Sequence, residues 1–127
     1  MKLISVNVGR PRPVPHKDRV VNTGIFKEPV AGPVFLRHLN LDGDGQADLR
    51  VHGGADKAVY AYPFEHYAFW EAELGRTDFS CGQFGENFTI IGWLEDMVCI
   101  GDEFQVGKAR VQVTQPRSPC FKLGIRI

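Results

Sequence analysis

The stretch KAVYAYPFEHYAFWEAELG, residues 57–75, decides the expected fold because it joins a β-like segment to one clear helix. The β-like residues 57–62 end at Pro63, and a proline suits the first position of a helix. Gly75 suits the C-terminal cap, where glycine adopts a left-handed conformation at little cost. Four large apolar residues recur at steps of three and four, as one helix face requires: Phe64, Tyr67, Trp70 and Leu74. The stretch predicts one helix over about residues 63–74.

Short strand patterns lie on both sides of this stretch. The residue pattern predicts strands over Leu3–Val8, Pro33–Leu39 and Phe88–Ile91. We expect an extended, exposed loop over Gly9–Pro15, which contains three prolines, and another loop over the glycine- and aspartate-rich residues 40–48. The chain therefore alternates short strands with loops before and after the helix.

A hairpin is expected near the end of the chain. The segments Asp102–Val106 and Ala109–Gln115 flank Gly107-Lys108, and glycine in the first position of a two-residue loop indicates a type II′ turn. With this hairpin the sequence contains about seven short strands and one clear helix. That pattern predicts a mainly β domain of barrel or sandwich type, because a series of βαβ units would need more helices.

Length and charge narrow the possible functions. The chain has 127 residues, enough for one domain, and its 43% hydrophobic and 24% charged content excludes intrinsic disorder and coiled coils. Fifteen basic and fifteen acidic residues cancel, so overall charge gives no argument for a nucleic-acid or anionic membrane partner. A local basic pocket for a small anion stays open. The N-terminal residues lack the apolar core of a signal peptide, and no apolar run approaches ~20 residues, so we expect a cytoplasmic protein.

The segment Asp42-Gly43-Asp44-Gly45-Gln46 has the beginning of a calcium-loop pattern. That pattern requires glycine at its sixth position and glutamate at its twelfth, where this chain has Ala47 and Gly53. We therefore expect no calcium site.

The three cysteines have different sequence surroundings. Their number is odd, and they form neither a C-x-x-C pair nor zinc-finger spacing. Without an export signal, a disulfide framework is not expected. We expect Cys99, which lies between two apolar residues, to be a small core residue, and Cys81 to lie in a loop. Cys120 follows two prolines, and Arg117 and Lys122 supply positive charge that favours a thiolate. A thiolate suits both nucleophiles and ligands of soft metals. A proline-bounded turn with a buried cysteine is the other interpretation.

Two further segments allow either a structural or a functional interpretation. His52 is followed by two glycines, which form a tight turn but also permit close approach of a ligand. Asn87 ends the segment Phe84-Gly85-Glu86-Asn87, which either caps a turn or presents an amide to a ligand. Turn chemistry is the favoured interpretation for this second segment. His66 lies away from the apolar face of the helix, so we expect it at the surface.

Several motifs taken together resemble the MOSC domain, which is named for the C-terminal part of molybdenum cofactor sulfurases. The greatest similarity is to its stand-alone bacterial YiiM-like branch, which is associated with resistance to N-hydroxylated purines. The motifs are Val51–Tyr60, Tyr62-Pro63, Glu65–Tyr67, Phe84–Asn87, Gly101-Asp102 and Gln115–Cys120. The resemblance implies a single MOSC domain over residues 1–127 with a β-barrel-like fold. It extends from about Ser5 to Lys122, and the usual C-terminal tail of the family is absent from this chain.

The resemblance also implies a molybdenum cofactor, a molybdenum-pyranopterin with a phosphate tail. Cys120 matches the molybdenum-ligating cysteine of the family, and a soft metal favours a thiolate over histidine. Asn87 matches an asparagine beside the cofactor. His52, in the histidine-glycine-glycine motif, is the candidate for proton delivery.

Basic residues are implied at the other end of the cofactor. Lys27 and Arg50 match residues near the pterin and its phosphate, and Arg117 and Ser118 lead into the cysteine ligand. We expect Lys27, Arg50 and Arg117 to form one basic cluster. Pyridoxal phosphate is not expected, because the sulfurases bind it in a separate domain that 127 residues cannot contain.

The leading hypothesis is a molybdenum-dependent oxidoreductase that reduces N-hydroxylated compounds of hydroxylaminopurine or amidoxime type. It would use an electron-donor protein of unknown identity. The alternative is a non-catalytic cofactor-binding or sulfur-carrier module with a persulfide on Cys120. A cysteine hydrolase that uses Cys120 and His52 ranks third, because no oxyanion motif accompanies the pair.

Overall fold

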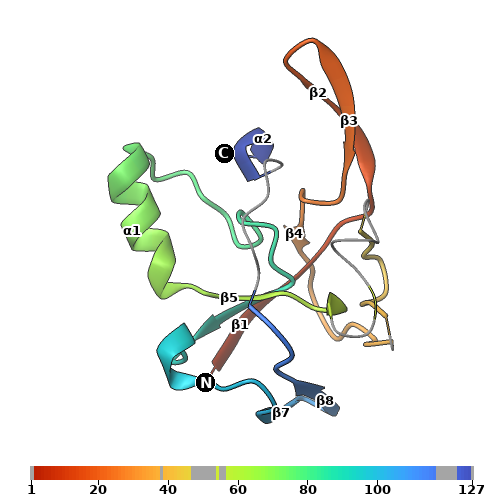
Figure 1. The fold of residues 1–127 in the computed structure, drawn as a ribbon, viewed down its shortest axis with the longest axis vertical. Coiled ribbons are helices and arrows are strands. Elements are labelled where there is room, and N and C mark those ends of the chain that lie inside the picture. The colour runs from red at the N-terminus through yellow and green to blue at the C-terminus, as the bar shows by residue number, and fades with distance from the viewer. Residues whose placement is uncertain (1, 38, 47–53, 55–56, 117–122, 127) are drawn as a thin grey trace.

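The centre of the molecule is a four-stranded sheet with strand order β4-β1-β6-β5. The computed structural model describes residues 2–37, 39–46, 54, 57–116 and 123–126. The strands of the sheet are β1 (Lys2–Val8), β4 (Glu28–Pro29), β5 (Ala61–Pro63) and β6 (Phe88–Ile91). β1 pairs antiparallel with both β4 and β6, whereas β5 pairs parallel with β6. Residues from the first, middle and last parts of the chain therefore meet in one sheet (Figure 1).

Two hairpins extend from this sheet. The hairpin of β2 (Arg12–His16) and β3 (Arg19–Thr23) projects at one end of the molecule, and that of β7 (Glu103–Val106) and β8 (Ala109–Gln112) lies at the other (Figure 1). Gly107 has a φ of 60° at the turn of the second hairpin, as the expected type II′ turn requires.

Helices occupy the remaining side of the molecule. The longest described helix, α1 (Glu65–Leu74), follows β5 directly, and Gly75 caps it in the left-handed conformation with a φ of 64°. A 3-10 turn, η2 (Glu95–Met97), and the short helix α2 (Leu123–Arg126) complete the elements. No helix in the described part of the chain is long and apolar enough to cross a bilayer.

Two clusters of apolar side chains pack around the sheet. Leu41, Phe88 and Ile90 form a buried core to which β1 and the β7–β8 hairpin add partly buried residues. The second cluster is aromatic and centres on Tyr67 of α1, whose ring lies 4.8–6.4 Å from those of Tyr62, Phe64, Phe79 and Phe84. This aromatic cluster attaches α1 to the turn that precedes β6.

The structure confirms the mainly β class with one clear helix, and it changes some boundaries. The helix begins at Glu65 rather than at residue 63, because Pro63 pairs with Ile90 in the sheet. The helix face is only partly covered, since Tyr67 is buried whereas Phe64 and Leu74 are 40% and 41% exposed. The described sheets form no closed barrel, so the barrel-like part of the expectation is not confirmed.

Three local predictions are wrong. Residues 12–15 of the expected loop belong to β2, since an exposed two-stranded hairpin tolerates prolines that lack an N–H donor. The described residues of Pro33–Leu39 form no strand and take part in a single bridge, between Leu36 and Leu41. Cys99 is exposed rather than part of the core, because it lies in a turn between η2 and β7.

Candidate functional site

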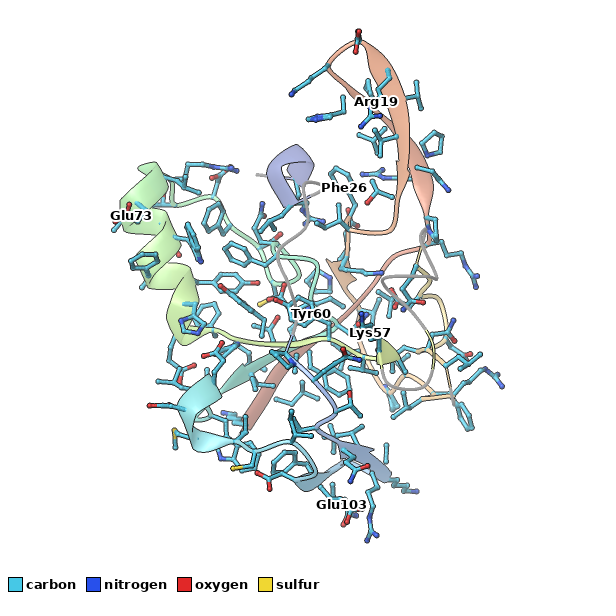
Figure 2. All side chains as sticks on the ribbon, viewed as in Figure 1. Arg19, Phe26, Lys57, Tyr60, Glu73 and Glu103 are labelled. Carbon is cyan, nitrogen blue, oxygen red and sulfur yellow. The ribbon has the colours of Figure 1, made fainter. Side chains whose placement is uncertain are left out.

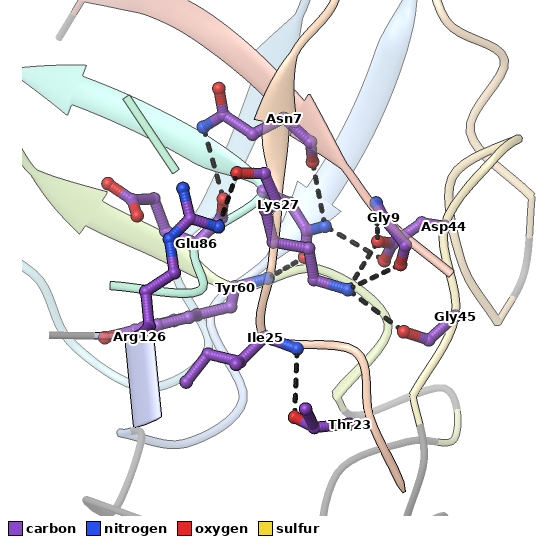
Figure 3. A network of polar contacts seen from close by, with 11 residues as sticks. Asn7, Gly9, Thr23, Ile25, Lys27, Asp44, Gly45, Tyr60, Glu86 and Arg126 are labelled. Atoms are coloured by element: carbon purple, nitrogen blue, oxygen red, sulfur yellow. Dashed lines mark hydrogen bonds and ion pairs between the residues drawn. The ribbon is translucent and has the colours of Figure 1, made fainter. Parts of the chain in front are cut away.

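A buried ion pair lies beside β1. Lys27, between β3 and β4, donates from Nζ to Oδ1 of Asp44 at 2.6 Å, and to the main-chain oxygens of Gly9 and Gly45 at 3.1 and 3.0 Å (Figure 3). The Lys27 and Asp44 side chains are 6% and 0% exposed. A lysine ammonium carries three protons, so these acceptors use its full donor capacity. The charge of Lys27 is thus balanced inside the protein.

Asp44 connects this lysine to Asn87. Its Oδ1 also accepts from the Gly9 N–H at 3.0 Å, and its Oδ2 accepts from Nδ2 of Asn87 at 2.9 Å. A buried carboxylate requires such partners, because desolvation otherwise disfavours its charge. Asp44 therefore places Lys27 and Asn87, which are 60 residues apart in sequence, at one polar centre.

Asn87 holds three chain segments together at this centre. Besides Asp44, its Nδ2 reaches the main-chain oxygen of Asn7 in β1 at 3.1 Å, and its Oδ1 accepts from the N–H of Tyr60 at 3.0 Å. The main-chain groups of Asn87 also bond to Asn7 and Tyr60, at 2.7 Å each. The asparagine thus ties β1 to the segment that leads into β5.

The neighbouring residue, Glu86, is a fully buried carboxyl group with neutral hydrogen-bond donors. The Tyr67 hydroxyl donates to it, as do the Phe84 N–H at 3.1 Å and the Thr89 hydroxyl at 3.2 Å. Burial raises the pKa of Glu86, because removal from water disfavours the charged form. Burial likewise raises the pKa of Tyr67, and the nearby negative charge of Glu86 adds to that effect.

A half-buried arginine lies close to the same centre. Arg126 in α2 donates from Nη1 to the main-chain oxygen of Lys27 at 3.1 Å (Figure 3). Its Cζ lies 5.2 Å from the centroid of the Phe26 ring. Burial lowers the pKa of Arg126, the direction expected for a cation with little solvent around it.

The structure brings together two of the residues expected at the cofactor, Lys27 and Asn87. The other five lie outside the described residues: His52, Arg50, Arg117, Ser118 and Cys120. Of the expected basic cluster, the structure thus places Lys27 alone, and the cluster stays a prediction. Within the described residues, no group of three histidine, cysteine or acidic side chains is arranged to hold a metal ion.

Sequence reasoning missed Asp44 as a member of the centre. Its segment has an aspartate between two glycines, which indicates a loop and part of a calcium-loop pattern rather than a buried ion pair. Its partner Lys27 lies 17 residues earlier, a spacing without any local signature. Gly85 has a φ of 83°, so the expected turn before β6 is present, and Glu86 accepts from the Phe84 N–H within that turn.

The other two candidate positions lie near the surface. His66 contacts Glu95 through Nε2 at 2.9 Å, with 34% of its side chain exposed, which agrees with the expected surface position. Cys81 is partly exposed in the turn after α1, as expected of a loop residue.

A mainly β domain with a buried polar centre between its sheet and its loops has known counterparts. The family model of the MOSC domain matches residues 48–127. The chain belongs to the MOSC domain family. MOSC domains are associated with binding of the molybdenum cofactor.

Among curated proteins, the chain is 50% identical to YflK of Bacillus subtilis (strain 168) over 121 residues, which are 95% of this chain and 54% of YflK. It is 46% identical to YiiM of Escherichia coli (strain K12) over 103 residues, 80% of this chain and 46% of YiiM. A protein named reductase from Gibberella moniliformis (strain M3125 / FGSC 7600) is 36% identical over 109 residues, 84% of this chain and 19% of that protein. The chain spans about half the length of YflK and YiiM.

A solved structure has the same fold. The crystal structure of YiiM from Geobacillus stearothermophilus matches with a TM-score of 0.74 and 43% identity, over 98% of this chain and 55% of that chain. The observed arrangement of one sheet, two hairpins and α1 is thus a YiiM-like fold.

The described residues fit an anionic, hydrogen-bonding cofactor at one point. Arg126 retains guanidinium N–H groups that have no hydrogen-bond partner in the described part of the chain. Lys27, in contrast, donates to protein acceptors. Cysteine sulfur is a suitable ligand for molybdenum. The expected cysteine ligand, Cys120, lies outside the described residues, so its place at the metal stays a prediction.

Proposed function

We propose that this chain is the cofactor-binding part of a molybdenum-dependent oxidoreductase that reduces N-hydroxylated compounds, of hydroxylaminopurine or amidoxime type. Membership of the MOSC family supports the cofactor. The relative named reductase supports the reaction class. The observation that carries the proposal is the match of the MOSC family model to residues 48–127. The centre of Lys27 and Asn87 supports it indirectly, since both match residues expected beside the cofactor but bond to protein atoms.

In this proposal, Cys120 would ligate the metal, and Arg50, Arg117 and Ser118 would bind the pterin and its phosphate. Asn87 and Lys27, which the family resemblance also assigns to the cofactor, would support the site through the buried polar centre. When bound, the cofactor would supply the two-electron chemistry, with the electrons coming from a donor protein of unknown identity. The described residues contribute rigidity, because Asp44 fixes Lys27 and Asn87 relative to each other. Substrate binding costs less free energy when the residues around the substrate are already held in place.

The reaction also requires protons at a defined place. Reduction of an N–OH group to N–H consumes two electrons and two protons and releases one water molecule. Histidine is the side chain that titrates closest to neutral pH. We assign proton delivery to His52, because two glycines after it permit close approach of a substrate. No nucleic-acid or membrane partner is part of the proposal, and a cytoplasmic location stays a prediction.

Two variants separate the roles of Cys120 and His52. Cys120→Ser should lose molybdenum and activity together, whereas His52→Ala should keep its molybdenum and lose roughly 10²–10⁴-fold in turnover, as for a missing general acid. The measurement is turnover of a hydroxylaminopurine with a reduced dye, with the metal counted in the same sample. Full activity of His52→Ala would remove this histidine from the mechanism.

The second candidate is a non-catalytic cofactor-binding or sulfur-carrier module with a persulfide on Cys120. The positive charge of Arg117 and Lys122 near Cys120 supports it, because a thiolate is also the nucleophile that carries sulfur as a persulfide. Wild-type protein that contains molybdenum but reduces no N-hydroxylated compound would support this candidate against the enzyme. A persulfide on Cys120 is detected by its release with a thiol reductant and by the added mass of one sulfur atom.

A further inference from the structure

Arg126 is a half-buried cation without an ion-pair partner in the described part of the chain. A guanidinium has five N–H donors, and the one described hydrogen bond of this side chain uses Nη1. Buried charges in proteins are normally paired or hydrogen-bonded, because burial without a partner is costly. The remaining donors of Arg126 therefore have no acceptor among the described residues and are accessible to an anion or to water.

A second cation lies against the same aromatic ring. The Cζ of Arg12, in β2, is 4.4 Å from the centroid of Phe26, and that of Arg126 is 5.2 Å from it. Figure 2 shows Phe26 between the base of the β2–β3 hairpin and α2. The positive charge of Arg12 contributes to the lowered pKa of Arg126, so the two guanidinium groups repel each other. Contact with the ring offsets part of that repulsion, and an anion would offset more of it.

The nearby acidic residues do not complete this site. Glu28 and Glu86 attract Arg126 through space, but neither forms an ion pair with it. The Glu86 carboxyl accepts from Tyr67, Phe84 and Thr89 instead. Burial favours its neutral form, which weakens its attraction for the arginine. Lys27 cannot bind an anion in place of Arg126, because its ammonium already donates to Asp44 and to two main-chain oxygens.

We propose that Arg126 and Arg12, beside Phe26, form a binding site for a phosphate-type oxyanion, such as a phosphate monoester. The planar fork of an arginine binds two oxygens of such a group, and a second guanidinium adds charge. This assignment differs from the expected basic cluster of Lys27, Arg50 and Arg117, and it holds whether or not the proposed reaction takes place. The phosphate belongs either to the cofactor or to a substrate.

The test is calorimetric titration with inorganic phosphate at constant ionic strength, adjusted with chloride. Wild-type protein should bind phosphate with a Kd on the order of millimolar. Arg126→Gln should weaken binding by about tenfold or more, the loss expected for charge-assisted hydrogen bonds. Arg126→Lys should give an intermediate affinity, because it keeps the charge and loses the fork. Arg110→Gln, at an exposed position of β8 at the other end of the molecule, is the matched control and should bind as wild type does.

Arg12→Gln is a second variant that tests the proposal even if Arg126→Gln unfolds. The Arg12 guanidinium contacts Phe26 but no main-chain group among the described residues, so we expect this variant to fold. Its expected effect is a severalfold weaker affinity at an unchanged melting temperature. Equal phosphate binding by wild type, Arg126→Gln and Arg12→Gln would overturn the proposal. So would the absence of binding by wild type, or an equal loss in Arg110→Gln.

Cofactor-free and cofactor-loaded samples distinguish the two sources of phosphate. If loading abolishes phosphate binding, the site holds the phosphate of the cofactor. If both samples bind phosphate equally, the site serves a substrate or another phosphorylated ligand. Both outcomes support an oxyanion site at Arg126, and neither depends on reduction of an N-hydroxylated compound.

Discussion

Asp44 is the residue on which the polar centre depends. Its carboxylate balances the positive charge of Lys27. It also accepts hydrogen bonds from the side-chain amide of Asn87 and from the Gly9 N–H. Replacement of such a partner leaves an uncompensated charge inside the protein, and this loss exceeds the net contribution of the intact pair. The neighbouring Asp42 pairs with Arg37 at the surface, where water screens both charges.

Asp44→Asn is predicted to lower the free energy of unfolding by about 3–5 kcal/mol, because Lys27 stays buried without its counter-charge. The measurement is urea unfolding followed by tryptophan fluorescence. Asp42→Asn is the matched control and should change stability little. Equal effects of the two variants would show that the buried pair does not dominate the centre.

The raised pKa of Glu86 predicts a specific pH dependence of stability. A carboxyl whose folded pKa exceeds its ordinary value of 4.5 binds protons more strongly in the folded state. Its stabilising contribution is complete below about pH 4.5 and is lost as the pH rises through the folded pKa. Glu86→Gln removes this titration, so the stability of wild type relative to the variant should fall as the pH increases. A constant difference between pH 4 and pH 8 would contradict the prediction.

At the scale of elements, the turn before β6 packs directly against the backbone of Lys27. Gly82, in this turn, has a φ of 89°, and a Cβ built on it would lie 2.5 Å from the Lys27 main-chain oxygen. Gly75, at the end of α1, also has a positive φ of 64°, but a Cβ there would meet no atom within 4 Å. The two glycines share the same conformational requirement and differ in packing.

Gly75→Ala is predicted to cost about 1–2 kcal/mol of stability, the usual penalty of a left-handed alanine. Gly82→Ala should cost clearly more, because its methyl group must also displace the Lys27 backbone. Urea unfolding of the two variants gives the comparison. Equal costs would mean that the contact between the turn and Lys27 relaxes freely.

Local signals in the sequence were sufficient for some elements and misleading for others. The Gly107-Lys108 turn and the Gly75 cap each depend on one residue type in one conformation, so both were predictable. The prolines of β2 are typical of a loop. An exposed two-stranded hairpin nevertheless accommodates residues that have no N–H donor. The apolar Pro33–Leu39 segment has strand-like composition but contributes one bridge, since composition does not specify a pairing partner.

For the whole molecule, sequence motifs point to single residues of the polar centre, and the role of these residues at a cofactor stays a prediction. Resemblance to MOSC domains pointed to Asn87 and Lys27, and the structure brings both to one centre. The partner that joins them, Asp44, was not predictable, because a contact across 17 and 43 residues leaves no periodic pattern. Arg126 likewise became a candidate only when its contacts with Phe26 and Lys27 were known.

Cofactor binding should stabilise the whole domain, because a ligand that binds only the folded state shifts the unfolding equilibrium. Wild type from a cofactor-producing host is predicted to melt about 5–15 °C above protein from a cofactor-deficient host. Cys120→Ser should show no such difference, whereas Cys81→Ser and Cys99→Ser should retain it. Scanning calorimetry measures all four proteins, and a retained difference in Cys120→Ser would exclude this cysteine as the ligand.

The pairing of β1 with β6 affects how the chain folds during synthesis. Asn7 and Thr89 bond directly although 82 residues separate them. At usual rates of translation, Asn7 is synthesised roughly 4–16 s before Thr89. During this interval β1 has an unpaired edge, which is a template for association with other chains. The central sheet can therefore close only after translation has passed Ile91, and until that point the edge of β1 is exposed to other chains.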